Sequence, residues 1–189
     1  MMTELGEPLH TIRLLQLSWI ERLKIVKGIA EILHRLAHSP LGSLSMNDMR
    51  RQQFVLVDNT LKLSDVDDVG IAEPTCLQDE QCAIRANNDS VIEQLICLNN
   101  TCKGYNERLN IWRAGQHFII KQFLPIGAPP FLESHIRDLL DAFERRSASA
   151  TWDTQRILEA TNSLLHLYET HDIDGTRKNY GSRKIPEEV

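Results

Sequence analysis

A segment in the first third of the chain constrains its fold more than any other. Residues 54–57 are apolar, residues 58–60 are typical of a turn, and residues 61–64 alternate between apolar and polar side chains. This pattern predicts a short β-hairpin, because a turn joins two runs that both favour strands. Acidic residues flank the hairpin, so its folding also decides which charged groups lie close together.

The predicted hairpin gathers oxygen-bearing side chains at one end. If Val57 pairs with Leu61, an antiparallel ladder places Gln53 opposite Asp65, with Cα atoms about 5 Å apart. Asp48 lies on the loop that leads into the same edge. Carboxylates that converge in this way repel one another unless a cation neutralises them. The arrangement therefore predicts a bound cation, most simply Mg²⁺ held through oxygens.

The spacing of these residues is similar to that of a protein-kinase catalytic segment. In kinases an Asp lies five positions before a metal-binding Asn, and a hairpin and a D-F-G triplet follow. Here Asp48 lies five positions before Gln53, and Asp65-Val66-Asp67 takes the place of the triplet. The amino-acid sequence resembles that of the lonesome-kinase branch of the divergent secretory-pathway kinases, from about Thr3 to about His171. The most specific matches are residues 38–43, 53–58 and 61–68.

This resemblance implies a fold and a division of the chain. The fold is mainly α-helical with a small β-hairpin (α+β), as in the C-terminal lobe of a protein kinase without its N-terminal lobe. Residues 1–9 would be a remnant of the hinge between the lobes, and residues 10–171 the C-terminal lobe with a cysteine-bearing insert at 69–104. Residues 172–189 are polar and are expected to form a flexible tail.

Apolar periodicity predicts the helices independently of the resemblance. Ser18 and Glu21 form a capping box, which begins a helix that ends before Pro40. Apolar residues recur at intervals of three and four in three further segments. These predicted helices span about residues 106–123, 131–146 and 151–169.

The resemblance also assigns roles to four residues near the hairpin. Asp48 would accept the proton of the substrate hydroxyl, or orient that hydroxyl toward the γ-phosphate of ATP. Asp65 would bind Mg²⁺ (or Mn²⁺), and Gln53 takes the place of the usual Asn as a second metal ligand. Arg50 lies two residues after Asp48, where some tyrosine kinases have Arg, and would stabilise phosphate charge.

The first nine residues resemble the hinge that contacts adenine through its backbone. Within them, Glu4 and Gly6 would form part of the nucleotide site. Asp67 stands where the D-F-G triplet has Gly, which removes easy access to positive φ. Asp67 and Asp68 have two interpretations, as ligands of a second cation or as a solvated acidic turn.

Four cysteines lie within one loop-rich segment and predict two disulfides. Their spacing is not that of a zinc ribbon, and no pair of histidines accompanies them at zinc-finger spacing. Disulfides require an oxidising compartment. Three pairings are possible, and the sequence leaves the choice open. The residues are Cys76, Cys82, Cys97 and Cys102.

Other features bear on the compartment and the partners. Asn88-Asp89-Ser90 and Asn99-Asn100-Thr101 are N-glycosylation acceptors. With the cysteines and the resemblance they indicate a secreted protein that passes through the Golgi lumen, although the N-terminus lacks the features of a signal peptide. No apolar stretch approaches the roughly 18 residues of a membrane-spanning helix. The net charge of −5 argues against a nucleic-acid-binding surface.

The functional hypothesis is the C-terminal lobe of a kinase that phosphorylates tyrosine in secreted or lumenal proteins. A Gly-rich loop and a strand Lys do not occur in this sequence, so this chain alone is expected to show little turnover. One alternative is a pseudokinase-like binding module without catalysis. The other is a disulfide-stapled helical interaction domain unrelated to kinases.

Overall fold

Helix α2 (Trp19–Ala37) is the central element of the fold. The structure is a computed structural model that describes residues 6–9, 14, 16–117, 120, 124–145 and 151–181. Of these, residues 172–181 are described by their backbone alone. The predicted capping box begins the helix. Ser18 Oγ accepts a hydrogen bond from the Glu21 N–H, and the Glu21 carboxylate accepts one from the Ser18 N–H at 2.8 Å. Its inner face is fully buried at Leu23, Val26, Ile29, Ala30 and Leu33.

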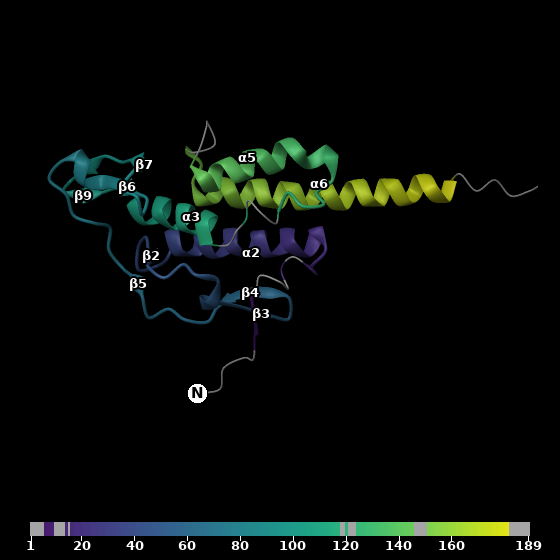
Figure 1. The fold of residues 1–189 in the computed structure, drawn as a ribbon, viewed down its shortest axis with the longest axis horizontal. Coiled ribbons are helices and arrows are strands. Elements are labelled where there is room, and N and C mark those ends of the chain that lie inside the picture. The colour runs from purple at the N-terminus through teal and green to yellow at the C-terminus, as the bar shows by residue number, and fades with distance from the viewer. Residues whose placement is uncertain are drawn as a thin grey trace, which may run out of the picture.

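The other elements lie in layers on either side of α2 (Figure 1). On one side lies an antiparallel sheet of order β1-β3-β4, whose strand β4 packs against α2. On the other side α2 packs against α6, which in turn contacts α5, while α3 contacts both α2 and α5. The strands are β1 (Glu7–Pro8), β3 (Phe54–Val57) and β4 (Thr60–Leu63), and the helices are α3 (Tyr105–His117), α5 (Glu133–Glu144) and α6 (Thr154–Gly181).

The predicted hairpin is present as β3 and β4, but the predicted register is wrong by one residue. Val57 pairs with Thr60 rather than with Leu61. The reason is a turn of two residues, Asp58 and Asn59, which both adopt positive φ (49° and 61°). Two such residues form the tight turn that best matches the twist of paired strands. Beyond the ladder, the Gln53 carbonyl accepts a hydrogen bond from the N–H of residue 64, not residue 65.

The helix boundaries differ in part from those predicted. The described part of α3 ends at His117, and residues 118–119 and 121–123, which the prediction included, lie outside the described residues. A 3₁₀ turn, η3 (Pro130–Leu132), precedes α5. Helix α6 begins at Thr154 because the Asp153 carboxylate accepts a hydrogen bond from the Arg156 N–H at 2.8 Å. It continues to Gly181, since no proline interrupts the polar sequence there.

The segment from residue 69 to 104 is more regular than the sequence suggests. It begins as β5 (Val69–Gly70), which pairs with β2 (Ser45–Met46) next to the loop that carries Asp48. A Cβ atom on Gly70 would lie 2.5 Å from Ser45 Oγ, so a larger residue at this position would require the Ser45 side chain to rotate away.

Two small hairpins and two disulfides follow in the same segment. The cysteines pair as Cys76–Cys97 and Cys82–Cys102, which settles the choice that the sequence left open. The elements are η2 (Asp79–Cys82), β6 (Ala83–Arg85), β7 (Val91–Gln94), β8 (Cys97–Leu98) and β9 (Thr101–Cys102), and β6 pairs with β7 and β8 with β9.

Two separate apolar clusters support this α+β architecture. The larger one lies between α2, α3, α5, α6 and the β3–β4 hairpin. The smaller one consists of Cys76, Cys82 and Cys102, with Leu95 and Tyr105 packed against them. Within the described ranges no helix is long and apolar enough to cross a membrane.

Candidate functional site

Asp48 lies on the loop between β2 and β3, where two neighbouring side chains hold its carboxylate. Arg50 donates hydrogen bonds to both carboxylate oxygens. Gln53 donates from Nε2 to Oδ2 at 2.5 Å. Gln53 reaches this position because residues 51–53 form a single 3₁₀ turn, η1 (Arg51–Gln53), directly before β3. The Asp48 side chain is 16% exposed, so the carboxylate is fixed and still accessible.

These contacts control the charge of Asp48. The hydrogen bond from Arg50, followed by the one from Gln53, lowers the Asp48 pKa from the ordinary value of 3.8 to about 2. The same contact raises the pKa of Arg50. Asp48 is therefore ionised throughout the physiological range of pH, and it offers a negatively charged acceptor for a hydroxyl group.

The structure brings Asp48, Gln53 and Asp65 together at one small pocket, which Asp68 also lines. The one-residue difference in register does not separate them, because Asp65 still follows β4 at the end of the hairpin where Gln53 lies. Asp65 Oδ1 accepts a hydrogen bond from the Asp67 N–H at 3.0 Å. Asp67 itself is not among the residues that line the pocket.

The residues that line this pocket are of the types that bind a hard cation such as Mg²⁺, but among the described residues no three carboxylates here have their oxygen atoms within 4.8 Å of one another. The cavity volume of about 10 Å³ is close to that needed by one water-sized occupant. The polar groups around it are the carboxylates of Asp48, Asp65 and Asp68 and the amide of Gln53. Since Nε2 of Gln53 is bound to Asp48, its carbonyl oxygen Oε1 is the atom that remains for a ligand. Carboxylate and amide oxygens are the donors that Mg²⁺ prefers.

Helix α3 fixes the loop that carries Asp48, through polar residues that the sequence analysis missed. Asn110 is fully buried; its Oδ1 accepts a hydrogen bond from the Met46 N–H at 2.9 Å, and its Nδ2 donates to the Leu44 carbonyl at 2.8 Å. Arg113 donates to the Met46 carbonyl at 2.9 Å. Asn106, also buried, donates to the carbonyls of residues 43 and 72 at 2.8 and 3.1 Å. The sequence pattern that could have indicated these residues is a pair of side-chain amides, Asn106 and Asn110, four positions apart on an otherwise apolar helix face.

The N-terminal segment that the sequence analysis interprets as a hinge lies against the same hairpin. Strand β1 pairs with β3, with Glu7 opposite Leu56. A Cβ atom on Gly6 would lie 2.6 Å from the Val55 Cβ atom, so this approach requires glycine at position 6. Glu4, which the sequence analysis assigned to the nucleotide site, lies outside the described residues.

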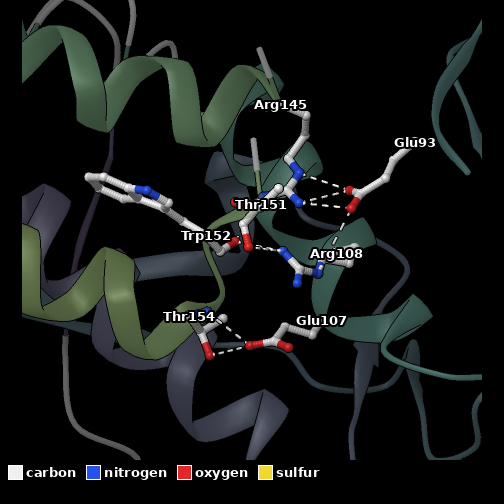
Figure 2. Close-up of polar contacts among 7 residues, drawn as sticks. All are labelled: Glu93, Glu107, Arg108, Arg145, Thr151, Trp152 and Thr154. Carbon is white, nitrogen blue, oxygen red and sulfur yellow. Dashed lines mark hydrogen bonds and ion pairs between the residues drawn. The ribbon is translucent and has the colours of Figure 1, made fainter. Parts of the chain in front are cut away.

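A polar cluster ties the insert to the helices (Figure 2). Arg145, at the C-terminus of α5, donates hydrogen bonds to both carboxylate oxygens of Glu93 on β7, at 2.9 and 3.0 Å. Arg145 also donates to the Trp152 carbonyl at 2.9 Å, and Arg108 of α3 donates to the same carbonyl at 2.8 Å. The Arg145 side chain is 1% exposed and that of Glu93 is 22% exposed, so the arginine is buried and the carboxylate is partly exposed.

Both glycosylation acceptors lie at exposed turns of the insert. Asn88 lies in the β6–β7 turn, where its Oδ1 accepts a hydrogen bond from Ser90 Oγ at 2.7 Å. Asn99 lies in the β8–β9 turn with φ of 52°. Each Asn side chain is therefore accessible to a modifying enzyme, and glycosylation stays a prediction.

Two comparisons with known proteins bear on the family of the chain. Residues 3–145 match the family model described as the protein-kinase domain of FAM69. The chain is 39% identical over 171 residues to a human protein named Extracellular tyrosine-protein kinase PKDCC. That match covers 89% of this chain and 33% of the human protein, so the chain spans about a third of its relative's length.

Proposed function

This chain belongs to the family of the FAM69 protein-kinase domain, and from this premise we propose that it is the C-terminal lobe of a protein kinase. The complete enzyme would transfer the γ-phosphate of ATP to tyrosine in secreted or lumenal proteins. The observation that carries the proposal is the pocket shared by Asp48, Gln53 and Asp65. A kinase requires these groups together, although they lie on opposite sides of the hairpin in the sequence.

Asp48 would orient the tyrosine hydroxyl toward the phosphate. Arg50 and Gln53 fix its carboxylate, and each carboxylate oxygen still has capacity for another hydrogen bond. Because the pKa of Asp48 is about 2, it is a weak base at neutral pH. Its main contribution is then the orientation of the hydroxyl, and it takes the proton only as the oxygen of the hydroxyl loses electron density to phosphorus.

Asp65 and Gln53 would hold Mg²⁺ or Mn²⁺ together with the phosphates of ATP. The metal would supply positive charge that bridges and neutralises these phosphates. Arg50, whose side chain is 61% exposed, would add charge beside the transferred group. The backbone near Gly6 would contact adenine, since β1 brings that segment to the hairpin.

Two features support an extracellular or Golgi-lumenal location. The insert holds two disulfides, Cys76–Cys97 and Cys82–Cys102, which require an oxidising compartment. The human relative is named an extracellular kinase. We propose that Asn88 and Asn99 carry N-glycans there.

A nucleotide-binding experiment tests the proposal on this chain. We expect ATP with Mg²⁺ or Mn²⁺ to raise the melting temperature, because a ligand that binds only the folded state stabilises it. Asp65→Asn should abolish that rise, whereas Asp138→Asn, the same change at an exposed site on α5, should leave it intact. A metal-dependent rise that survives Asp65→Asn would contradict the assigned site. Absence of any rise in the unaltered chain would favour a binding module without nucleotide chemistry.

That second candidate has one specific observation in its favour. The Gln53 amide is already engaged by the Asp48 carboxylate, and its side chain is longer than the Asn usual at this position. The two candidates also differ in turnover. Little phosphorylation of a tyrosine peptide is expected from this chain alone, and activity that disappears on Asp48→Ala would show that it is catalytically complete.

A further inference from the structure

A large groove opens beside the loop that carries Asp48. It lies between the β6–β7 hairpin of the insert and helix α3, and its cavity volume is about 750 Å³. Asn47, the neighbour of Asp48, lines one end of it, and His117 lines the groove from the C-terminal end of α3. His117 lies close enough to Asp48 and Arg50 to feel the charge of both. One end of the groove therefore lies at the residue next to Asp48, although Asp48 itself is not among the lining residues.

The lining of the groove is cationic and contains no acidic residue among the described residues. Arg85 and Arg113 line it and carry its positive charge, whereas burial and the charge of Arg113 lower the pKa of His117, which lines the groove as a mostly uncharged side chain at neutral pH. The chain as a whole has 26 acidic and 21 basic residues, so a surface without an acidic residue differs from the average of the molecule. Asp89, which does not line the groove, forms an ion pair with Arg85 at 3.7 Å. Both of these side chains are well exposed, so their ion pair contributes little free energy. A carboxylate of a ligand can therefore replace Asp89 as the partner of Arg85 at little cost.

The rest of the lining suits a polypeptide. Leu109 and Trp112 of α3 supply apolar surface, and the side-chain amide of Gln116 supplies hydrogen-bonding groups. Apolar surface beside a few polar groups is typical of sites that bind a ligand in a defined orientation. The β6–β7 hairpin forms the wall of the groove opposite α3. It is held in place because Glu93 on β7 is bound to the buried Arg145.

We propose that this groove binds an acidic segment of the protein substrate and presents a neighbouring hydroxyl-bearing residue to Asp48. The inference rests on the proposed kinase function and adds to it the chemical class of the substrate sequence. Arg85 and Arg113 attract the acidic side chains, and the apolar surface of Trp112 contacts the rest of the segment. Selectivity then comes from electrostatic complementarity between the groove and the substrate.

A direct binding experiment tests the proposal without requiring catalysis. The fluorescence anisotropy of a labelled peptide with one tyrosine and flanking glutamates is measured against this chain, in the absence of nucleotide. Matched peptides carry glutamine or lysine in place of glutamate. Because Asn88 also lines the groove, a glycan there would stand at its edge. All samples therefore carry Ser90→Ala, which removes the acceptor sequence and keeps Asn88.

The expected result is binding in the order glutamate, glutamine, lysine, with an affinity for the glutamate peptide that falls as salt rises. Gln116→Glu, which adds a negative charge to the groove, should weaken binding of the glutamate peptide about threefold. Arg85→Gln should act in the same direction. Asn162→Asp adds the same charge on α6, at an exposed position that does not line the groove, and should have no effect.

Several outcomes would overturn the inference. These are absence of binding, equal binding of the three peptides, or equal effects of Gln116→Glu and Asn162→Asp. The result is separable from the proposed function: nucleotide binding that depends on Asp65, without peptide selectivity, would leave the kinase proposal standing and remove this one.

Discussion

The ionisation of Asp48 depends on one neighbour more than on any other group. Arg50 is the largest cause of its low pKa, followed by Gln53. Arg50→Gln should therefore raise the Asp48 pKa from about 2 toward the ordinary 3.8, as followed by carbon NMR of the side-chain carboxyl during an acid titration. Arg137→Gln removes an arginine whose side chain is 66% exposed and pairs with Glu133, and should leave the Asp48 pKa unchanged.

The same shift has a consequence for acid stability. Because the pKa of Asp48 is lower in the folded state than in the unfolded state, its ionised form stabilises the fold at pH values above 3.8. That contribution is lost as the pH falls through about 2. In Arg50→Gln the folded-state pKa of Asp48 lies closer to the unfolded value, so this contribution is smaller and is fully lost at a higher pH, and the acid-unfolding midpoint moves upward. An unchanged Asp48 pKa in this variant would show that Arg50 does not hold the carboxylate.

For single residues, the sequence predicts the side chains of the candidate site better than the residues that hold them in place. Asp48, Gln53 and Asp65 are recognisable because their spacing and the hairpin between them are local features. The buried amides of Asn106 and Asn110 hold the Asp48 loop through its backbone. Backbone atoms carry no sequence signal of their own, so these contacts become visible only when α3 lies beside β2.

The β6–β7 hairpin depends on the ion pair between Arg145 and Glu93 for its place on the helices. Burial lowers the pKa of Arg145 despite the attraction of Glu93, which shows that the arginine loses hydration when it is enclosed. Such a pair adds little net stability compared with an apolar pair, but removal of Arg145 leaves the partly buried Glu93 carboxylate with the more distant Arg108 at 4.0 Å. It also takes one donor from the Trp152 carbonyl. Arg145→Gln should therefore cost about 3 kcal/mol in the free energy of unfolding, measured by urea denaturation.

The matched control for this prediction is again Arg137→Gln. Its partner Glu133 is 79% exposed, so the change should alter the free energy of unfolding by less than about 0.5 kcal/mol. Hydrogen exchange gives a second measurement, because Arg145→Gln should increase exchange at β6 and β7 more than in α2. Equal destabilisation by the two substitutions would show that the ion pair does not anchor the hairpin.

Elements differ in how far the sequence predicts them. Helix α2 follows from a capping box and an apolar repeat, which are both properties of adjacent turns. The hairpin was predicted, but its register depends on whether Asp58 and Asn59 alone form the turn, and several loop lengths fit the same composition. The disulfide pairing could not be predicted, since it depends on the distances between segments that only the folded insert brings together.

At the scale of the whole molecule, the described residues form two apolar clusters that depend on different interactions. The larger cluster lies between the helices and the β3–β4 hairpin and contains no cysteine among its described members. The smaller cluster lies in the insert and is built around the disulfides. A segment with so few buried apolar side chains cannot offset the loss of chain entropy on folding without cross-links. The helical part should therefore retain its structure under conditions that disorder the insert.

Removal of one disulfide tests this division. Cys76→Ser combined with Cys97→Ser opens a bridge between residues 21 positions apart, and the insert should lose about 3 kcal/mol of stability. Hydrogen exchange should then accelerate in β6–β9, while circular dichroism keeps its helical signal. Cys82→Ser combined with Cys102→Ser should cost more, because both of these residues are fully buried and the hydroxyls would have no polar partner in the smaller cluster. Cooperative loss of the helices in either variant would mean that the insert and the helical part unfold as one unit. The groove between the insert and α3 would then depend on both disulfides.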